Sequence, residues 1–89
     1  MHYTYILFSK TINKFYVGVS NNPTDRLKKH NSKNKGYTNQ TNDWDIVFLC
    51  AFEMKTEALN FEKKIKSWKS KLKIHKLISS SAGLNHPDA

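Results

Sequence analysis

Two tyrosines near the amino terminus are the first side chains whose spacing could bring reactive groups together. Tyr5 and Tyr16 stand in two apolar segments joined by a short run of turn residues, and a tight hairpin can place such residues side by side. Gly18 shares the face of Tyr16 and has no side chain, which leaves room for a ligand to approach the backbone. Judged singly, each tyrosine is at least as compatible with an ordinary strand position.

A basic pair follows the two tyrosines. Arg26 and His30 are four residues apart, so a helix places them on one face. In a basic chain both side chains can bind phosphate, although each is also an ordinary surface residue. Alone, this pair indicates at most that an anionic ligand binds, and it does not indicate which reaction, if any, takes place.

A single carboxylate stands out in the second half of the chain. Helical spacing predicts one apolar stripe, which contains Ala58, Phe61, Ile65, Trp68 and Leu72. Glu62 falls inside this arc, where a carboxylate loses hydration and needs a cation or a donor in compensation. The purely structural interpretation is a glutamate paired with Lys66, four residues further on.

The elements that must position these side chains follow from the apolar patterns. Residues 3–8 and 14–19 are predicted strands of an antiparallel hairpin, and residues 23–31 are a predicted helix capped by Asn22. Residues 32–44 are polar and predicted to form a mobile loop. Residues 45–53 form the most apolar strand, which we expect at the sheet centre, and residues 56–68 form a long helix. This helix is expected to break near Ser70 before a short helix over residues 71–78.

These elements predict one α/β domain over residues 1–78, an α+β sandwich in the order ββαβα(α). Its three-stranded sheet has an antiparallel N-terminal hairpin, and helices pack on the sheet. Residues 79–89 show no pattern and are expected to be a disordered tail. The lone Cys50 lies in an apolar run and is expected to be a small buried residue in a reducing compartment.

The charge of the chain indicates its partner. Fifteen lysines and arginines against seven acids give a formal net charge of +8, and residues 26–35 and 63–76 contain no acid. Such a field attracts polyanions, and its plainer interpretation is a solvated surface. No apolar run approaches the roughly 20 residues that span a membrane, and no signal peptide is evident, so we expect a cytoplasmic protein without a membrane partner.

Taken together, these positions resemble the GIY-YIG nuclease family. That family opens with a Gly-Ile-Tyr-like strand and a Tyr-Ile-Gly-like strand, whose counterparts here are Tyr3-Thr4-Tyr5 and Tyr16-Val17-Gly18. Arg26 follows ten residues after the second tyrosine, and His30 four residues later. Glu62, on the second long helix, completes the set. The resemblance covers residues 2–75 and is strongest for compact, stand-alone bacterial members.

Two positions depart from the family pattern. Tyr3 and Thr4 stand where the first motif has glycine and isoleucine. Val19 stands where some repair nucleases of the family have a lysine, so no lysine role is expected there.

The resemblance implies a metal-dependent endonuclease, with Mg²⁺ or Mn²⁺ as the cofactor and Glu62 as its ligand. It implies that Arg26 holds the phosphate, that Tyr16 deprotonates or positions the attacking water, and that His30 shares the proton. Tyr5 then orients the phosphate or supports Tyr16. Structure-selective or weakly sequence-specific cutting is expected, in DNA repair or recombination.

Further contacts to nucleic acid, with DNA favoured over RNA, are expected from basic and aromatic side chains: Lys28, Lys29, Lys33, Lys35, Tyr37, Lys66 and Lys69. The protein is expected to act as a monomer or a weak homodimer. Two other interpretations stay open. One is a catalytically weak nucleic-acid-binding module of the same fold, and the other is a protein-interaction or ribosome-associated domain that uses the lysine-rich helix.

Overall fold

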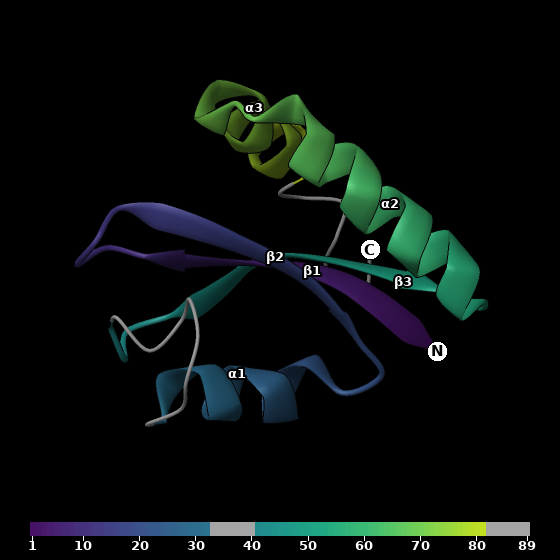
Figure 1. The fold of residues 1–89 in the computed structure, drawn as a ribbon, viewed down its shortest axis with the longest axis horizontal. Helices are drawn as coiled ribbons and strands as arrows, with labels where there is room; N and C mark the ends of the chain where they lie inside the picture. Colours follow the sequence, from purple (N-terminus) through teal and green to yellow (C-terminus); the bar gives the residue numbers. More distant parts are fainter. Residues whose placement is uncertain (33–40, 82–89) are drawn as a thin grey trace.

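The computed structural model describes residues 1–32 and 41–81 of the chain, as a three-stranded sheet with helices on both faces (Figure 1). The elements are β1 (His2–Ser9), β2 (Lys14–Ser20), α1 (Pro23–Asn31), β3 (Asp45–Phe52), α2 (Lys55–Trp68) and α3 (Lys71–Ser81). The predicted α+β class and the order ββαβαα are therefore confirmed.

The sheet is antiparallel throughout and has the order β2-β1-β3. The expectation that the third strand lies at the centre is wrong, because β1 lies there and β3 forms an edge. Four successive residues of β1, from Thr4 to Leu7, are buried, whereas β3 buries only Phe48 fully. Apolar content alone misplaced β3 because several of its apolar residues are only partly covered by the helices.

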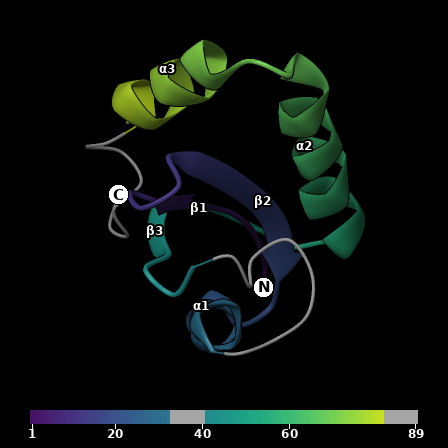
Figure 2. The same cartoon turned by 60° about the vertical axis from the view of Figure 1, so that its left-hand side comes forward.

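The helices divide the strand side chains into two cores. Figure 1 shows α1 against one face of the sheet and α2 and α3 against the other, and Figure 2 shows α2 and α3 meeting at an angle around the sheet. Successive strand residues point to opposite faces. One core, with Ile6 and Ile65, lies toward α2 and α3, and the second, with Tyr5, Leu7 and Trp44, lies toward α1.

The first helix begins as predicted. The Asn22 side chain accepts a hydrogen bond from the backbone N–H of Asp25 at 3.1 Å, and Pro23 occupies the first turn. Basic residues follow in the last turn, where they complement the helix dipole.

The second helix ends at Lys69, whose left-handed backbone (φ 49°) separates it from α3. The predicted break near Ser70 is thus confirmed. α3 runs to Ser81, so residues 79–81 of the expected tail are helical, and residues 82–89 lie outside the described residues. Among residues 1–32 and 41–81, no helix is long and apolar enough to cross a membrane.

Cys50 is a free, half-buried thiol of β3 that packs against the core on the α2 side. Burial raises the pKa of this thiol, which disfavours the reactive thiolate. Its surroundings match those of a small apolar side chain.

Candidate active site

Tyr5 and Tyr16 meet on the α1 face of the sheet because of the hairpin register. Tyr5 pairs with Gly18 and Leu7 pairs with Tyr16, so the tyrosines are diagonal neighbours on adjacent strands. Their ring centroids are 6.4 Å apart. Tyr5 is fully buried and Tyr16 is half-buried, so the solvent-accessible part of the pair belongs to Tyr16.

Gly18 is buried, and the two phenol rings fill the space beside it. A Cβ at this position would lie 2.6 Å from the hydroxyl oxygen of Tyr5 and 3.1 Å from a ring carbon of Tyr16. The prediction that Gly18 leaves room for a ligand is therefore wrong, because the phenol of Tyr5 takes that room. Only glycine allows Tyr5 to lie across β2 in this way.

His30 approaches the tyrosines from α1. Its Nε2 lies 3.1 Å from the hydroxyl oxygen of Tyr5, and its ring centroid lies 4.7 Å from that of Tyr16. The side chain is 7% exposed, and burial, followed by the positive charge of Arg26, lowers its pKa below 6.5. His30 is therefore neutral at neutral pH and able to accept a proton.

Tyr5 stays protonated at neutral pH. Burial raises the pKa of its phenol above 10, a side-chain hydrogen bond from Arg26 acts in the opposite direction, and the negative charge of Glu62 adds to the rise. The same phenol oxygen lies within hydrogen-bond distance of Nε2 of His30, and the tautomer of the imidazole sets which of the two groups donates. Arg26, Tyr5 and His30 thus form one connected polar set.

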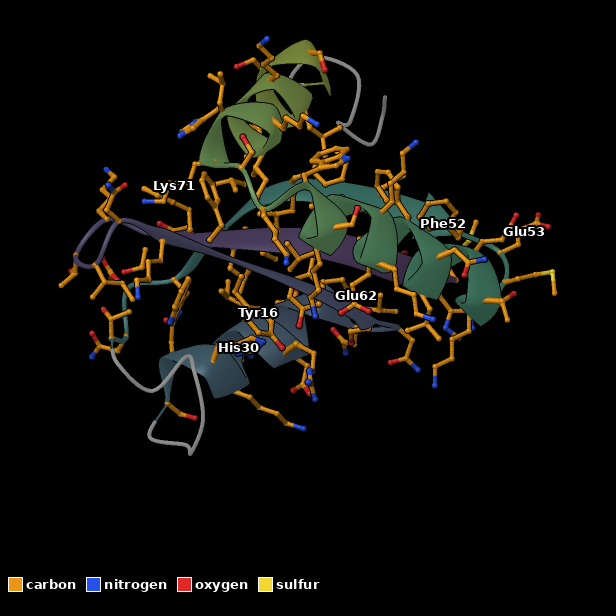
Figure 3. All side chains as sticks on the ribbon, turned by 45° about the horizontal axis from the view of Figure 1, so that its top comes forward. Tyr16, His30, Phe52, Glu53, Glu62 and Lys71 are labelled. Carbon is orange, nitrogen blue, oxygen red and sulfur yellow. The ribbon has the colours of Figure 1, made fainter. Side chains whose placement is uncertain are left out.

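Glu62 comes from the opposite side of the sheet. β2 is an edge strand, and Figure 3 shows Glu62 on the flank of α2 that faces Tyr16 and His30. Its side chain is 18% exposed, and its Oε2 lies 3.0 Å from Nζ of Lys66. The ion pair with Lys66, which is the purely structural interpretation of Glu62 drawn from the sequence, is therefore present. Since the charge of Glu62 also acts on Tyr5, the acid lies within electrostatic range of the buried phenol.

A buried hydrogen bond fixes α2 over the central strand. The Thr4 hydroxyl donates to the backbone carbonyl of Ala58 at 2.8 Å, and both residues are fully buried. Glu62 lies one helical turn after Ala58, so this bond determines where the carboxylate stands relative to the tyrosines.

Asn31 fixes the end of α1 that bears His30. Its side-chain nitrogen donates to the Trp44 carbonyl at 2.9 Å, and its side-chain oxygen accepts from the Trp44 backbone N–H at 2.8 Å. Trp44 is 1% exposed and packs in the same core as Tyr5. Sequence reasoning missed Asn31, because it is the last residue of the predicted helix and its partner Trp44 lies 13 residues further on, at the end of the predicted loop.

Asp43 joins the segment before β3 to the β1–β2 turn. Its carboxylate accepts hydrogen bonds from the Ser9 hydroxyl (2.5 Å), the Thr41 hydroxyl (2.6 Å), and the hydroxyl and backbone N–H of Thr11 (2.9 and 3.1 Å). These bonds, that of Ser9 above all, hold the pKa of this carboxyl well below its usual range. Asp43 therefore has a structural role, which its isolated position in the sequence did not indicate.

A polar cavity of about 400 Å³ lies beside Arg26, at the start of α1 and of α2. Its lining comprises His2, Val19, Ser20, Asn21, Asn22, Asp25, Arg26, Lys29 and Lys55. The cations in this lining, Arg26, Lys29 and Lys55, carry the charge that a bound phosphate would require. Sequence reasoning missed His2 and Lys55 because neither is near the motif residues in the chain.

The predicted basic contacts divide into three groups. Lys29 lines the cavity beside Arg26, whereas Lys28 is exposed on α1 and does not line it. Lys66 and Lys69 line a separate hollow together with Tyr16. The remaining three, Lys33, Lys35 and Tyr37, lie outside the described residues.

Comparison with known proteins agrees with this geometry. Residues 1–76 match the family model of the GIY-YIG catalytic domain. The chain belongs to the GIY-YIG family. It is also 35% identical to the UPF0213 protein BH0048 of Halalkalibacterium halodurans over 83 residues, which are 92% of this chain and 86% of that protein. None of the solved structures matches the chain.

Membership of the GIY-YIG family gives the chain a nuclease-type fold, and members of this family are generally endonucleases. The structure shows where the two residues that depart from the GIY-YIG pattern lie and what they contact. Thr4, in the isoleucine position of the first motif, makes the bond to Ala58. Val19, where some members have lysine, lines the cavity beside Arg26, and Lys55 of α2 brings a cation to the same cavity.

GIY-YIG nucleases generally use divalent metal ions, so the donor set must be compared with that chemistry. Within the described ranges no group of three or more His, Cys, Asp or Glu could hold a metal ion. Glu62 offers a single, partly exposed carboxylate. Mg²⁺ and Mn²⁺ take oxygen ligands and bind through one or two carboxylates, water and substrate phosphate, so this donor set fits them.

Proposed function

We propose that this protein is a metal-dependent endonuclease that hydrolyses phosphodiester bonds in nucleic acid, with DNA favoured over RNA. One observation supports the proposal above the others: Tyr5, Tyr16 and His30 form a cluster in contact with Arg26, at the sheet edge that Glu62 faces. Five functional groups from four elements converge although most are far apart in the chain.

The reaction adds water to phosphorus and breaks the bond to the departing sugar oxygen. Arg26 holds the phosphate oxygens through its planar fork. Tyr16, the more accessible phenol, positions the water or takes its proton, and His30 shares that proton because it is neutral. Tyr5 keeps its proton and fixes the orientation of His30.

Glu62 is the residue that would hold Mg²⁺ or Mn²⁺. When bound, the metal supplies positive charge that stabilises the negative charge developing on the departing oxygen. In the structure the ammonium of Lys66 neutralises this carboxylate at 3.0 Å.

The decisive experiment compares Glu62, in the middle of α2, with Glu53, in the turn between β3 and α2. Glu62→Gln is expected to lower Mg²⁺-dependent cutting of plasmid and branched DNA at least about 100-fold, a loss typical of one electrostatic catalytic group. Glu53→Gln removes the same charge at an exposed position far from Tyr16 and should cut normally (Figure 3). Full cutting by the Glu62→Gln protein would contradict the metal role.

A second candidate function is a nucleic-acid-binding module with little catalytic activity. The ion pair between Glu62 and Lys66 favours it, because a carboxylate already neutralised by lysine has less need of a metal. This function predicts salt-sensitive binding without Mg²⁺-dependent products. Incubating labelled nucleic acid with the protein and Mg²⁺ or Mn²⁺ separates the two functions.

A further inference from the structure

A groove follows the outer side of β2, away from the polar cavity at Arg26. It consists of two adjoining hollows of about 290 and 310 Å³, which share Phe15, Lys69 and Ile74 in their linings. The first hollow begins at Tyr16, and the second reaches the start of α3. We call this feature the β2-edge groove.

The chemistry of the β2-edge groove differs from that of the cavity beside Arg26. Its lining is largely apolar and includes the half-buried ring of Phe15, against which His75 packs edge-on at a centroid distance of 5.1 Å. Around this apolar floor stand four lysines: Lys14, Lys66, Lys69 and Lys71. Among the described residues that line the groove there is no acid.

One of the lysines is held in place by the backbone, and another stands at a turn in the chain. Lys69 has a left-handed backbone (φ 49°) at the junction of α2 and α3. Nζ of Lys71 donates to the carbonyl of Asn13 at 2.5 Å, which keeps the ammonium beside the hairpin turn. Figure 3 shows Lys71 at the hairpin end of the sheet, and Tyr16 and Glu62 nearer its middle.

We infer that the β2-edge groove binds an unpaired nucleic-acid strand as it leaves the active site. Proteins bind single strands through aromatic side chains, on which the bases stack, and through a surrounding row of cations, which bind the phosphates. A duplex has its bases already stacked and offers only phosphates. The polar cavity beside Arg26 suits the paired side of such a substrate, because backbone contacts dominate duplex recognition.

This inference rests on the proposed function for the position of the cut, and it names the preferred substrate: a junction between paired and unpaired nucleic acid. Of the four lysines, Lys66 is paired with Glu62, and the other three favour nucleic acid over a peptide strand added to the edge of β2.

The test measures binding by fluorescence anisotropy, without a divalent metal, so that it does not depend on cutting. A blunt DNA duplex is compared with the same duplex carrying a single-stranded thymidine arm, and with one whose arm is abasic. The thymidine arm should tighten binding about tenfold or more, as one stacked base is worth that much. The abasic arm should lose most of this gain, and equal gains from both arms would refute stacking on Phe15.

The matched variants remove two charges each. Lys14→Ala with Lys69→Asn, where asparagine tolerates the left-handed backbone, should weaken binding of both the thymidine and the abasic arm, because the two arms share the phosphates that these lysines contact. It should also lower the salt slope of arm binding by about 1.4, since each single-strand phosphate contact contributes about 0.7. The control, Lys63→Ala with Lys64→Ala, removes two exposed charges elsewhere on α2 and should keep the gain.

The outcomes separate this inference from the proposed function. An arm that leaves affinity unchanged, or equal losses in both double variants, would overturn the inference. Mg²⁺-dependent cutting that Glu62→Gln abolishes would then still support the nuclease. An arm effect without any cutting would support the groove and contradict the nuclease.

Discussion

Replacing Gly18 by alanine tests whether the active site depends on the close packing of its two tyrosines. The new methyl carbon would lie 2.6 Å from the Tyr5 hydroxyl oxygen, whereas ordinary contact begins at 3.4 Å, so the phenol must move by about 0.8 Å. Tyr5 is fully buried and bonded to His30 at 3.1 Å, so it has little space to move. Overpacking of this kind costs about 1–3 kcal/mol, which is a large share of the roughly 5 kcal/mol expected for so small a domain.

The same displacement should disturb catalysis more than stability. A misplacement of about 1 Å can lower a rate about 100-fold, so Gly18→Ala should cut that much more slowly even at temperatures where it is folded. Urea denaturation measures the stability, and circular dichroism confirms the folded state during the cleavage assay.

A double-mutant cycle identifies the cause. Tyr5→Leu removes the two nearest atoms that the methyl group would meet and leaves the approach of 3.1 Å to Tyr16, so adding Gly18→Ala to that variant should cost clearly less than it does in the wild type. The reasoning is refuted if Gly18→Ala unfolds at the wild-type urea concentration and cuts normally, or if its cost is the same with leucine at position 5.

Two further predictions concern the end of α1. The lowered pKa of His30 means that the unfolded chain binds a proton more readily, so stability should fall as the pH drops below about 6.5 toward the lowered value. Urea midpoints at about pH 7.5 and pH 5.5 should show this fall, and His30→Gln should reduce it; an unchanged pH dependence would refute the shift. Asn31→Ala leaves the backbone polar groups of Trp44 without their partner and should cost about 1–3 kcal/mol of unfolding free energy. A melting temperature equal to wild type would show that this anchor is unimportant.

Glu62 forms an ion pair in the structure and is also the proposed metal ligand. Glu62 both pairs with Lys66 and faces the tyrosine cluster, and a helical pair at this spacing, here with an exposed lysine, contributes about 0.2–0.5 kcal/mol. A weak partner is easily displaced, so the ion pair does not oppose metal binding strongly. The structural and the functional interpretations of Glu62 are therefore compatible.

The local chemistry of the sequence determined most of the elements and the membership of the family. Alternating apolar residues indicated the strands, the Asn22 cap and Pro23 indicated where α1 begins, and five motif positions indicated the GIY-YIG family. These features depend on neighbours within a few residues, which is why the sequence displays them.

Only the tertiary structure decided what depends on contacts between distant segments. It placed β1 rather than β3 at the sheet centre, because burial is set by where the helices pack. It showed that Gly18 makes room for Tyr5, that Asn31 holds Trp44, and that Lys55 joins the cavity beside Arg26. Such pairings leave no local periodicity or motif, since their free energy arises only when the chain brings the partners together.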